Sequence, residues 1–296
     1  MDGVLLIDKP AGPTSHDVVA RMRVVTGERS IGHTGTLDPR ATGLLPLVLG
    51  KATRLAALLT GSDKTYDAGI RLGYATDTDD AAGTPLGAPA APLPDAEAIR
   101  LALESFRGTF EQTPPDHSAK RVDGRKAYDL ARKAVAVELK PVEVTVKALT
   151  LGGYEDGVVH VSVTATAGFY VRALARDLGR RLGCGGHLSA LRRTRSGTFD
   201  VSSALPLEDA ERFGPDVALR LISPDEALPD LAAVHLTDAG LRRASHGNPI
   251  GPEHVEERWL PGPTAGRPVK VLDGAGRLVA LAHARGGALH PIVVLG

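Results

Sequence analysis

Gly32-His33-Thr34-Gly35-Thr36-Leu37-Asp38-Pro39-Arg40-Ala41-Thr42-Gly43-Leu44-Leu45-Pro46 is the stretch around which this chain of 296 residues is organised. Its glycines permit positive φ angles and close approach of another backbone, and Pro39 favours an extended Asp38. An Asp-Pro turn would explain Asp38 alone. The nearby His33 and the apolar run at 44–49 instead favour an irregular loop that holds a carboxylate and is anchored by a buried strand.

Length and composition limit the classes of protein to consider. A chain of this length, with 43% hydrophobic residues, suits one large domain and one small one. Its single cysteine, Cys184, excludes a disulfide framework and, with no secretory pattern at the start, predicts a cytoplasmic location. No apolar run approaches the roughly 18 residues of a membrane helix, so we expect a soluble protein.

The formal net charge is zero, but the charges are segregated along the chain. Residues 171–195 carry seven arginines against one aspartate, and residues 116–140 carry seven basic against four acidic residues. Residues 200–230 hold eight acidic residues and two arginines. One basic face and one acidic face are therefore expected, and a basic face is typical of a polyanion partner.

The spacing of apolar residues predicts a chain of mixed helices and strands. Strands are expected at 3–10, 47–50 and 64–72, with a hairpin of 142–151 and 158–166 joined by 152–157. Helices are expected at 15–25, 52–59, 95–105 and 169–182, the last with leucines on one side and arginines on the other. Residues 113–140 indicate a basic insertion with a helix at 126–133, and 206–229 an acidic linker.

The composition changes after residue 231. A short helix at 237–244 and strands at 269–272, 278–283 and 291–295 indicate a β-rich unit. At about 65 residues, this unit has the size of an autonomous domain.

Several chemistries are excluded by spacing. Six residues separate Gly43 from Gly50 where a phosphate loop has four, and Ala52 stands in place of its Ser or Thr. One cysteine and scattered histidines make no metal-binding cluster, which also excludes a zinc deaminase. No Gly-x-Ser-x-Gly elbow is present for a serine nucleophile.

Asp38 remains as a lone carboxylate that needs a cation to stay ionised and oriented, and Arg172 is the candidate cation. Taken singly, Arg172 is equally well explained as a solvated helix residue, while Tyr66 is better explained as a core aromatic and His33 as a turn hydrogen-bonder. The basic cluster at 192–195 is by itself more typical of a solvated face. Together these residues predict a basic face around one aspartate.

The motif at 32–46 resembles the catalytic motif of bacterial tRNA pseudouridine-55 synthases of the TruB type. Further segments agree with that family in order: 8–15, 64–66, 114–119, 124–132 and 170–179. The resemblance implies an α+β fold with a mixed, largely antiparallel sheet. It also implies a catalytic domain at 1–228 with a thumb insertion at about 113–140, and a small β-rich, PUA-like RNA-binding domain at 229–296.

The reaction implied is isomerisation of uridine 55 in the T-loop of tRNA to pseudouridine. The base is flipped out, its glycosidic bond is broken, and C5 is joined to the sugar, with no cofactor and no metal. The partner implied is the T-arm of tRNA, bound by a monomer that needs no protein partner.

By position, Asp38 matches the family's essential aspartate, Tyr66 the tyrosine that stacks on the flipped base and accepts the C5 proton, and Arg172 the arginine paired with the aspartate. Whether Asp38 attacks C1′ or C6, or assists a glycal route, stays open. The resemblance implies further substrate contacts, at His33, Lys9, Tyr170, Leu191, Arg125, Lys126 and Arg132.

The chain departs from the family pattern at 165–169 and 117–121, where hydroxyl contacts and T-loop packing are affected. Two alternatives are a guide-dependent pseudouridine synthase that works with protein partners and a non-catalytic RNA-binding protein on the same scaffold. The thumb-like insertion and the bacterial-style order of the motifs favour the standalone tRNA enzyme over the first alternative. The presence of Asp38, Tyr66 and Arg172 together argues against the second.

Overall fold

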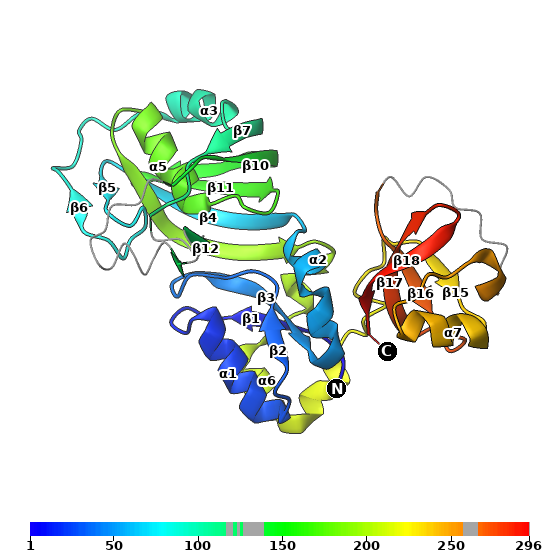
Figure 1. The fold of residues 1–296 in the computed structure, drawn as a ribbon. Coiled ribbons are helices and arrows are strands. Elements are labelled where there is room, and N and C mark those ends of the chain that lie inside the picture. Colours follow the sequence, from blue (N-terminus) through cyan, green and yellow to red (C-terminus); the bar gives the residue numbers. More distant parts are fainter. Residues whose placement is uncertain (117–120, 123–124, 127–138, 257–265, 296) are drawn as a thin grey trace.

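The computed structural model describes residues 1–116, 121–122, 125–126, 139–256 and 266–295 (Figure 1). A ten-stranded sheet forms the frame of the larger part, in the order β14-β1-β3-β12-β4-β11-β10-β7, with β2 beside β3 and β13 beside β12. Its strands are β1 (Gly3–Lys9), β2 (Ile31–His33), β3 (Thr42–Leu49), β4 (Lys64–Leu72), β7 (Gly108–Gln112), β10 (Val142–Glu155), β11 (Val158–Ala165), β12 (Gly186–Ser196), β13 (Phe199–Asp200) and β14 (Leu205–Pro206).

Two strand pairs of this sheet are parallel, β1 with β14 and β3 with β12, and the other pairs are antiparallel. The expected mixed, largely antiparallel sheet is therefore confirmed. The junction of β3 with β12 joins the two halves of the sheet, and Gly43 is required there. A Cβ on Gly43 would lie 2.3 Å from the carbonyl oxygen of Arg193.

Strands β1 and β3 are apolar almost throughout because both faces of this part of the sheet are covered. On one face, helix α1 (Ser15–Thr26), helix α6 (Leu207–Phe213) and the 3₁₀ helix η3 (Gly214–Arg220) pack against Leu5, Ile7 and Leu47. On the other face, η1 (Gly50–Leu55) and α2 (Ala56–Thr60) pack against Val4 and Val48.

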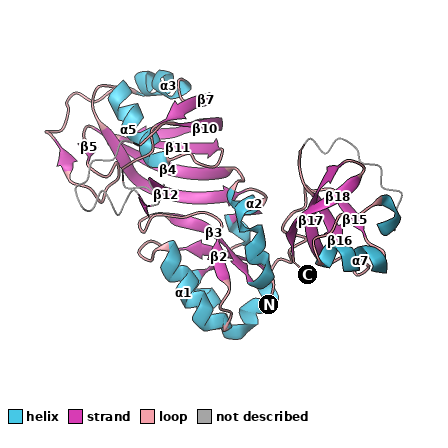
Figure 2. Ribbon diagram, in the orientation of Figure 1, coloured by secondary structure: helices cyan, strands magenta, loops and turns pink. Residues whose placement is uncertain are grey.

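Helix α1 begins as the sequence predicts. Thr14 is its N-cap, and Thr14 and Asp17 form a reciprocal capping box that satisfies two backbone donors of the first turn. On the other half of the sheet, α3 (Ala96–Glu104) and α5 (Val171–Arg181) bury their apolar sides against β4, β10 and β11. Both helices lie on the same side of these strands (Figures 1 and 2).

Three expectations about the elements are corrected. The stretch 32–46 is irregular only at 34–41, because β2 and β3 extend into it. The connection expected at 152–157 is a two-residue turn at Asp156 and Gly157, both with positive φ, because β10 continues to Glu155. The linker expected at 206–229 contains α6 and η3, whose buried Leu207, Ala210 and Val217 pack under α1.

The region 113–140 is described only in part. Arg121–Val122 (β8) pairs with Arg125–Lys126 (β9), so Lys126 lies in a short strand and not in the helix expected at 126–133. The remainder of that expected helix lies outside the described residues.

The C-terminal unit is a four-stranded sheet in the order β15-β16-β17-β18 with one helix against it (Figure 1). Its elements are β15 (Ala233–His235), α7 (Asp238–Ser245), β16 (Val269–Leu272), β17 (Leu278–Arg285) and β18 (Ala288–Val294). Leu272, Leu281 and Leu295 join the apolar cluster that contains Val4 and Leu55, so the unit packs against the larger part through buried side chains.

Candidate active site

The Asp38 loop, residues 34–41, is held at several points between β2 and β3. Ser15, the first residue of α1, donates from its hydroxyl to the carbonyl of Leu37 and accepts from the Leu37 N–H, at 3.1 and 2.9 Å. The N–H of Gly12 donates to the carbonyl of Pro39 at 2.8 Å. These contacts place Asp38 at a defined position next to the start of α1.

Lys9, the last residue of β1, supports the same loop through its side chain. Its side chain is fully buried, and its ammonium donates to the carbonyls of Pro10, Pro13 and Pro39 at 2.9, 2.9 and 3.2 Å. Burial lowers the pKa of Lys9 to about 8, an effect that the charge of Asp38 opposes. All three hydrogen bonds go to carbonyls, so Lys9 fixes the loop, and its contact with the substrate stays a prediction.

Asp38 is paired with Arg172. The Nε of Arg172 lies 3.0 Å from Oδ2 of Asp38, and Nη2 donates to Oδ1 at 3.5 Å. The arginine side chain is 7% exposed and the aspartate side chain 40%, so the cation is fixed while the carboxylate remains open to one side. Of the solvated and the paired interpretations of Arg172, the structure shows the paired one.

The position of Arg172 in α5 makes a carboxylate partner necessary for the stability of this buried cation. Arg172 lies in the first turn of the helix, where the helix dipole disfavours a cation. The carboxylates of Asp38 and, at 4.0 Å, Asp80 offset that cost. Burial raises the pKa of Asp38, and the nearby Asp80 adds to this, while Arg172 and Lys9 act in the opposite direction.

The helix that carries Arg172 is positioned by Gln112, which is buried at the end of β7. Its side-chain amide donates to the carbonyl of Tyr170 at 3.1 Å and accepts from the Tyr170 N–H at 2.8 Å. Tyr170 is the N-cap of α5 and has no side-chain cap of its own. Gln112 therefore gives its backbone N–H an acceptor at this helix start and adds a second donor to a carbonyl that also accepts from the N–H of Leu174.

A cavity of about 280 Å³ opens beside Asp38. Tyr66 from β4, Tyr170 and Arg172 from the start of α5, and Leu191 from β12 contribute to its wall. The structure therefore brings five of the predicted site residues to one cavity, namely Asp38 and these four. Their roles in binding and reaction stay predictions.

Arg193 is a residue of this site that the sequence did not single out. It was grouped with the basic cluster at 192–195 that is typical of a solvated face, but its side chain is 1% exposed. Its Nε donates to the carbonyl of Leu44 at 2.7 Å and its Nη2 to the carbonyl of Gly35 at 3.0 Å. Arg193 thereby joins β12 to both sides of the Asp38 loop.

Arg193 also contacts the tyrosine. Tyr66 and Arg193 are directly opposite in the β4–β12 register, and both contribute to the wall of the cavity. Burial lowers the pKa of Arg193, and its hydrogen bond and charge interaction with Tyr66 oppose that shift. Burial, aided by the charge of Arg193, lowers the pKa of Lys64 to about 8. The cavity wall on this side is positively charged.

His33 lies at the edge of the loop rather than in the cavity wall. Its Nδ1 accepts from the N–H of Gly35 at 3.3 Å, and its ring makes an edge contact with His16, with centroids 6.1 Å apart. Burial lowers the pKa of His33, and the charges of His16 and Arg193 add to this. The turn hydrogen bond considered for His33 is present, and its contact with RNA stays a prediction.

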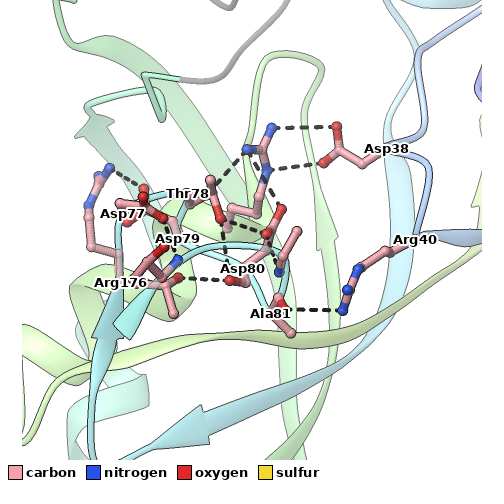
Figure 3. Close-up of polar contacts among 12 residues, drawn as sticks. Asp38, Arg40, Asp77, Thr78, Asp79, Asp80, Ala81 and Arg176 are labelled. Atoms are coloured by element: carbon pink, nitrogen blue, oxygen red, sulfur yellow. Dashed lines mark hydrogen bonds and ion pairs between the residues drawn. The ribbon is translucent and has the colours of Figure 1, made fainter. Parts of the chain in front are cut away.

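A second loop, residues 76–84, completes the surroundings of Arg172. It connects β5 (Ala75–Thr76) to β6 (Pro85–Leu86). Nη1 of Arg172 donates to the carbonyl of Thr78 at 3.3 Å, and Arg40 of the Asp38 loop donates to the carbonyl of Ala81 at 3.1 Å. Figure 3 shows Asp38 and Arg176 on opposite sides of this loop.

The remaining predicted contacts fall in the partly described insertion. Arg125 and Lys126 lie in β9, whose side chains are not described, and Arg132 lies outside the described residues. Over the described ranges, no group of three or more His, Cys, Asp and Glu side chains is placed to hold a metal ion. The same ranges contain no helix with the length and apolar character needed to cross a membrane.

Comparison with solved structures confirms the fold. The chain superposes on a Cbf5-Nop10-Gar1 complex with a TM-score of 0.74 and 26% identity, covering 99% of this chain and 85% of the other. An H/ACA ribonucleoprotein bound to a substrate RNA containing 2′-deoxyuridine gives a TM-score of 0.73 and 25% identity, with the same coverage.

Comparison with sequences gives the family. The model of the N-terminal domain of the TruB family pseudouridylate synthases matches residues 23–171, and that of the tRNA pseudouridylate synthase B C-terminal domain matches residues 172–216. The tRNA pseudouridine synthase B of Solibacter usitatus is 40% identical over 300 residues and covers 100% of both chains. That of Thermobifida fusca is 43% identical over 303 residues, covering 99% of this chain and 98% of its own. Likeness of this extent over the whole length shows that the chain belongs to the TruB family of tRNA pseudouridine synthases.

Proposed function

We propose that the chain converts uridine 55 in the T-loop of tRNA to pseudouridine, with Asp38 as the essential carboxylate and without a cofactor or metal. The observation that carries this proposal is the Asp38–Arg172 ion pair at the mouth of a cavity that Tyr66 also lines. It combines an ionised, oriented carboxylate with an aromatic ring in a space of about 280 Å³.

A cavity of this size holds a single nucleotide rather than a stacked helix, so the target base must leave its stack. Unstacking costs about a few kcal/mol, and stacking on an aromatic side chain with basic contacts to phosphates offsets it. Tyr66 supplies the ring, and Arg193 and Lys64 make the wall around it positive. The wall would also favour the anionic backbone of the flipped nucleotide.

In the proposed reaction, the bond between N1 of uracil and C1′ of the ribose breaks with participation of the Asp38 carboxylate. The base rotates within the cavity, and a bond forms between C5 and C1′. C5 then loses its proton, which Tyr66 accepts, and N1 gains one. Arg172 keeps Asp38 ionised and oriented throughout.

We further propose that residues 1–228 form the catalytic domain and residues 229–296 a PUA-like RNA-binding domain. The separate four-stranded sheet supports this division. Its apolar contact with the larger part would hold the RNA-binding surface of the C-terminal unit at a constant distance from Asp38.

The free, buried Cys184 favours a reducing, cytoplasmic compartment.

Binding through phosphates predicts that the affinity for tRNA falls steeply as the salt concentration rises. An affinity that does not change with salt would contradict binding of tRNA by a basic face.

The alternative in the same enzyme class is a synthase that needs a guide and partner proteins, because the similar solved structures are of such complexes. Full-length likeness to proteins named tRNA pseudouridine synthase B favours activity on tRNA. The second alternative is an RNA-binding protein without catalysis.

One assay decides among these. A tRNA transcript and an isolated T-arm hairpin, both labelled with tritium at C5 of uridine, are incubated with the purified chain. Tritium release from the hairpin, lost when uridine 55 is replaced by cytidine, supports the proposal. Release only after addition of a guide and partner proteins supports the guided enzyme, and binding without release supports the non-catalytic protein.

A further inference from the structure

Arg176 is a second buried arginine on α5, one turn after Arg172. The sequence pattern places the leucines of this helix on one side and its arginines on the other, and Arg172 and Arg176 are only 6% and 9% exposed. Residues four apart lie on the same face of a helix. Both side chains therefore extend toward the same neighbour, the loop at 76–84.

The donors of Arg176 connect three segments. Nη1 donates to Oδ2 of Asp79 at 3.0 Å, and Nη2 donates to the carbonyl of Thr113 at 2.8 Å. Nε donates to Oδ1 of Asp177 at 2.9 Å. Asp79 is itself mostly buried, with 14% of its side chain exposed. A buried carboxylate of this kind is costly without its cation.

The loop at 76–84 is built around Asp79. This residue has a left-handed backbone conformation, with φ of 61°, which is uncommon for a residue with a side chain and persists only when the surroundings enforce it. Its carbonyl accepts from the N–H of Leu188 at 2.9 Å, and the N–H of Ala81 donates to the carbonyl of Leu188 at 2.9 Å. The loop is thus fastened to β12 by its backbone and to α5 by the Asp79 side chain.

The residues on either side of Asp79 contact Arg172. The carbonyl of Thr78 accepts from Nη1 of Arg172, and Asp80 Oδ2 lies 4.0 Å from the same atom. The Asp80 carboxylate is in turn oriented by the hydroxyl of Thr78 at 2.7 Å and the N–H of Ala82 at 2.9 Å. Through these contacts the loop supports Nη1 of Arg172, the guanidinium nitrogen that does not bind Asp38.

We propose that Arg176 is a positioning residue for the reaction: by holding Asp79, it keeps Thr78 and Asp80 against Arg172 and so keeps Arg172 aligned with Asp38. The inference rests on the proposed function, because it concerns the rate of the step in which Asp38 takes part. Arg176 lies outside the cavity wall, so it acts on the reacting carboxylate only through the loop and Arg172.

The test uses single-turnover tritium release, with the purified full-length chain in excess over C5-labelled tRNA, and separate measurement of the dissociation constant. Arg176→Met removes the cation and keeps an apolar stem of similar length. We expect the rate constant to fall about 10- to 100-fold, as when a reacting group is misplaced by a remote change, while the dissociation constant stays within about twofold. Arg176→Lys should recover part of the rate, because it restores a cation beside Asp79.

The pH dependence of the tritium-release rate distinguishes a loss of Arg172–Asp38 alignment from a loss of protein stability. Asp38 faces Arg172, Asp80 and Lys9, and loss of alignment with Arg172 weakens the main influence that keeps its pKa down. The acid limb of the rate should therefore move to higher pH in Arg176→Met. Arg180→Met is the matched control, since Arg180 is on the same helix and also pairs with Asp177, but is 72% exposed. Its rate and acid limb should match those of the wild type.

Asp79→Asn tests the same link if Arg176→Met does not fold. It should lower the rate in the same direction, and the double variant should be no slower than the slower single one, because both changes break one contact. A lowered melting temperature with an unchanged rate constant and acid limb would overturn the inference. Absence of tritium release by the wild type would instead overturn the proposed function.

Discussion

Arg172 and Asp38 meet through two points of contact, Nε to Oδ2 at 3.0 Å and Nη2 to Oδ1 at 3.5 Å, although they come from a helix and a loop that are 134 residues apart in the chain. The arginine is nearly fully buried, and the carboxylate keeps one side open to the cavity. This asymmetry leaves the aspartate oriented and still accessible, which is the condition that a nucleophilic or basic carboxylate requires.

The pH dependence of the reaction should reflect the surroundings of Asp38. Burial and Asp80 raise its pKa above the ordinary value of 3.8, so the proportion of ionised Asp38, and with it the rate, falls as pH drops through that raised pKa. Replacing Asp80 by Asn removes one negative charge and keeps an acceptor for the Thr78 hydroxyl. We expect the acid limb of single-turnover tritium release to move to lower pH.

Asp77→Asn is the control for this shift, because Asp77 is in the same loop and its carboxylate caps the N–H of Thr84 instead. Its acid limb should coincide with that of the wild type. An acid limb that stays in place in Asp80→Asn, or moves upward, would show that Asp80 does not act on Asp38 through its charge.

Tyr66→Phe tests the proton-accepting role of the hydroxyl. The ring that would stack on the base is retained, so binding of tRNA should be unchanged. Loss of the acceptor should make departure of the C5 proton limiting, and substrate deuterated at C5 should then react more slowly than protiated substrate in the variant. If the variant binds tRNA more weakly and shows no larger isotope effect than the wild type, the hydroxyl has another role.

Arg193→Met tests the joint between β12 and the Asp38 loop. Removal of the guanidinium breaks its hydrogen bonds to the carbonyls of Leu44, which is buried, and Gly35, which is partly buried, and this should reduce the free energy of unfolding by about 2–4 kcal/mol. Urea unfolding followed by circular dichroism measures this. Arg192→Met is the neighbouring control, because Arg192 is 41% exposed and pairs with Asp8 near the surface. It should cost less than about 1 kcal/mol, and equal losses would argue against a special role for Arg193.

Much of the architecture could be predicted from pattern alone. Strands β4 and β11 alternate apolar and polar residues. Thr14 and Asp17 form a capping pattern that marks the start of α1. The motif around Asp38 identified the family by resemblance. The residue types made Arg172 only a candidate cation for Asp38, and the pairing itself followed from that resemblance, since nothing local in the sequence indicates that two distant residues will meet.

The misinterpretations have physical causes. Neighbouring residues in a strand point to opposite faces, so Arg192 and Arg193 could not both be solvated once that segment is a strand. The helical pattern of α5 did not show that Arg172 and Arg176 are buried, because arginine is seldom buried. Their carboxylate partners, Asp38 and the acidic residues of the loop at 76–84, explain why these two are. The many acidic residues at 206–229 likewise led to the prediction of a linker there. The segment contains α6, whose few apolar side chains are enough to pack it against α1.

Asp38→Asn provides the most direct test of the account. The variant keeps the size of the side chain and removes the charge, so tRNA binding, measured by filter retention, should stay within about threefold of the wild type. Single-turnover release of tritium from C5-labelled tRNA should fall by at least about 10³-fold, as expected when an essential reacting group is removed. Release at a rate near that of the wild type would contradict the claim that the Asp38 carboxylate carries the reaction.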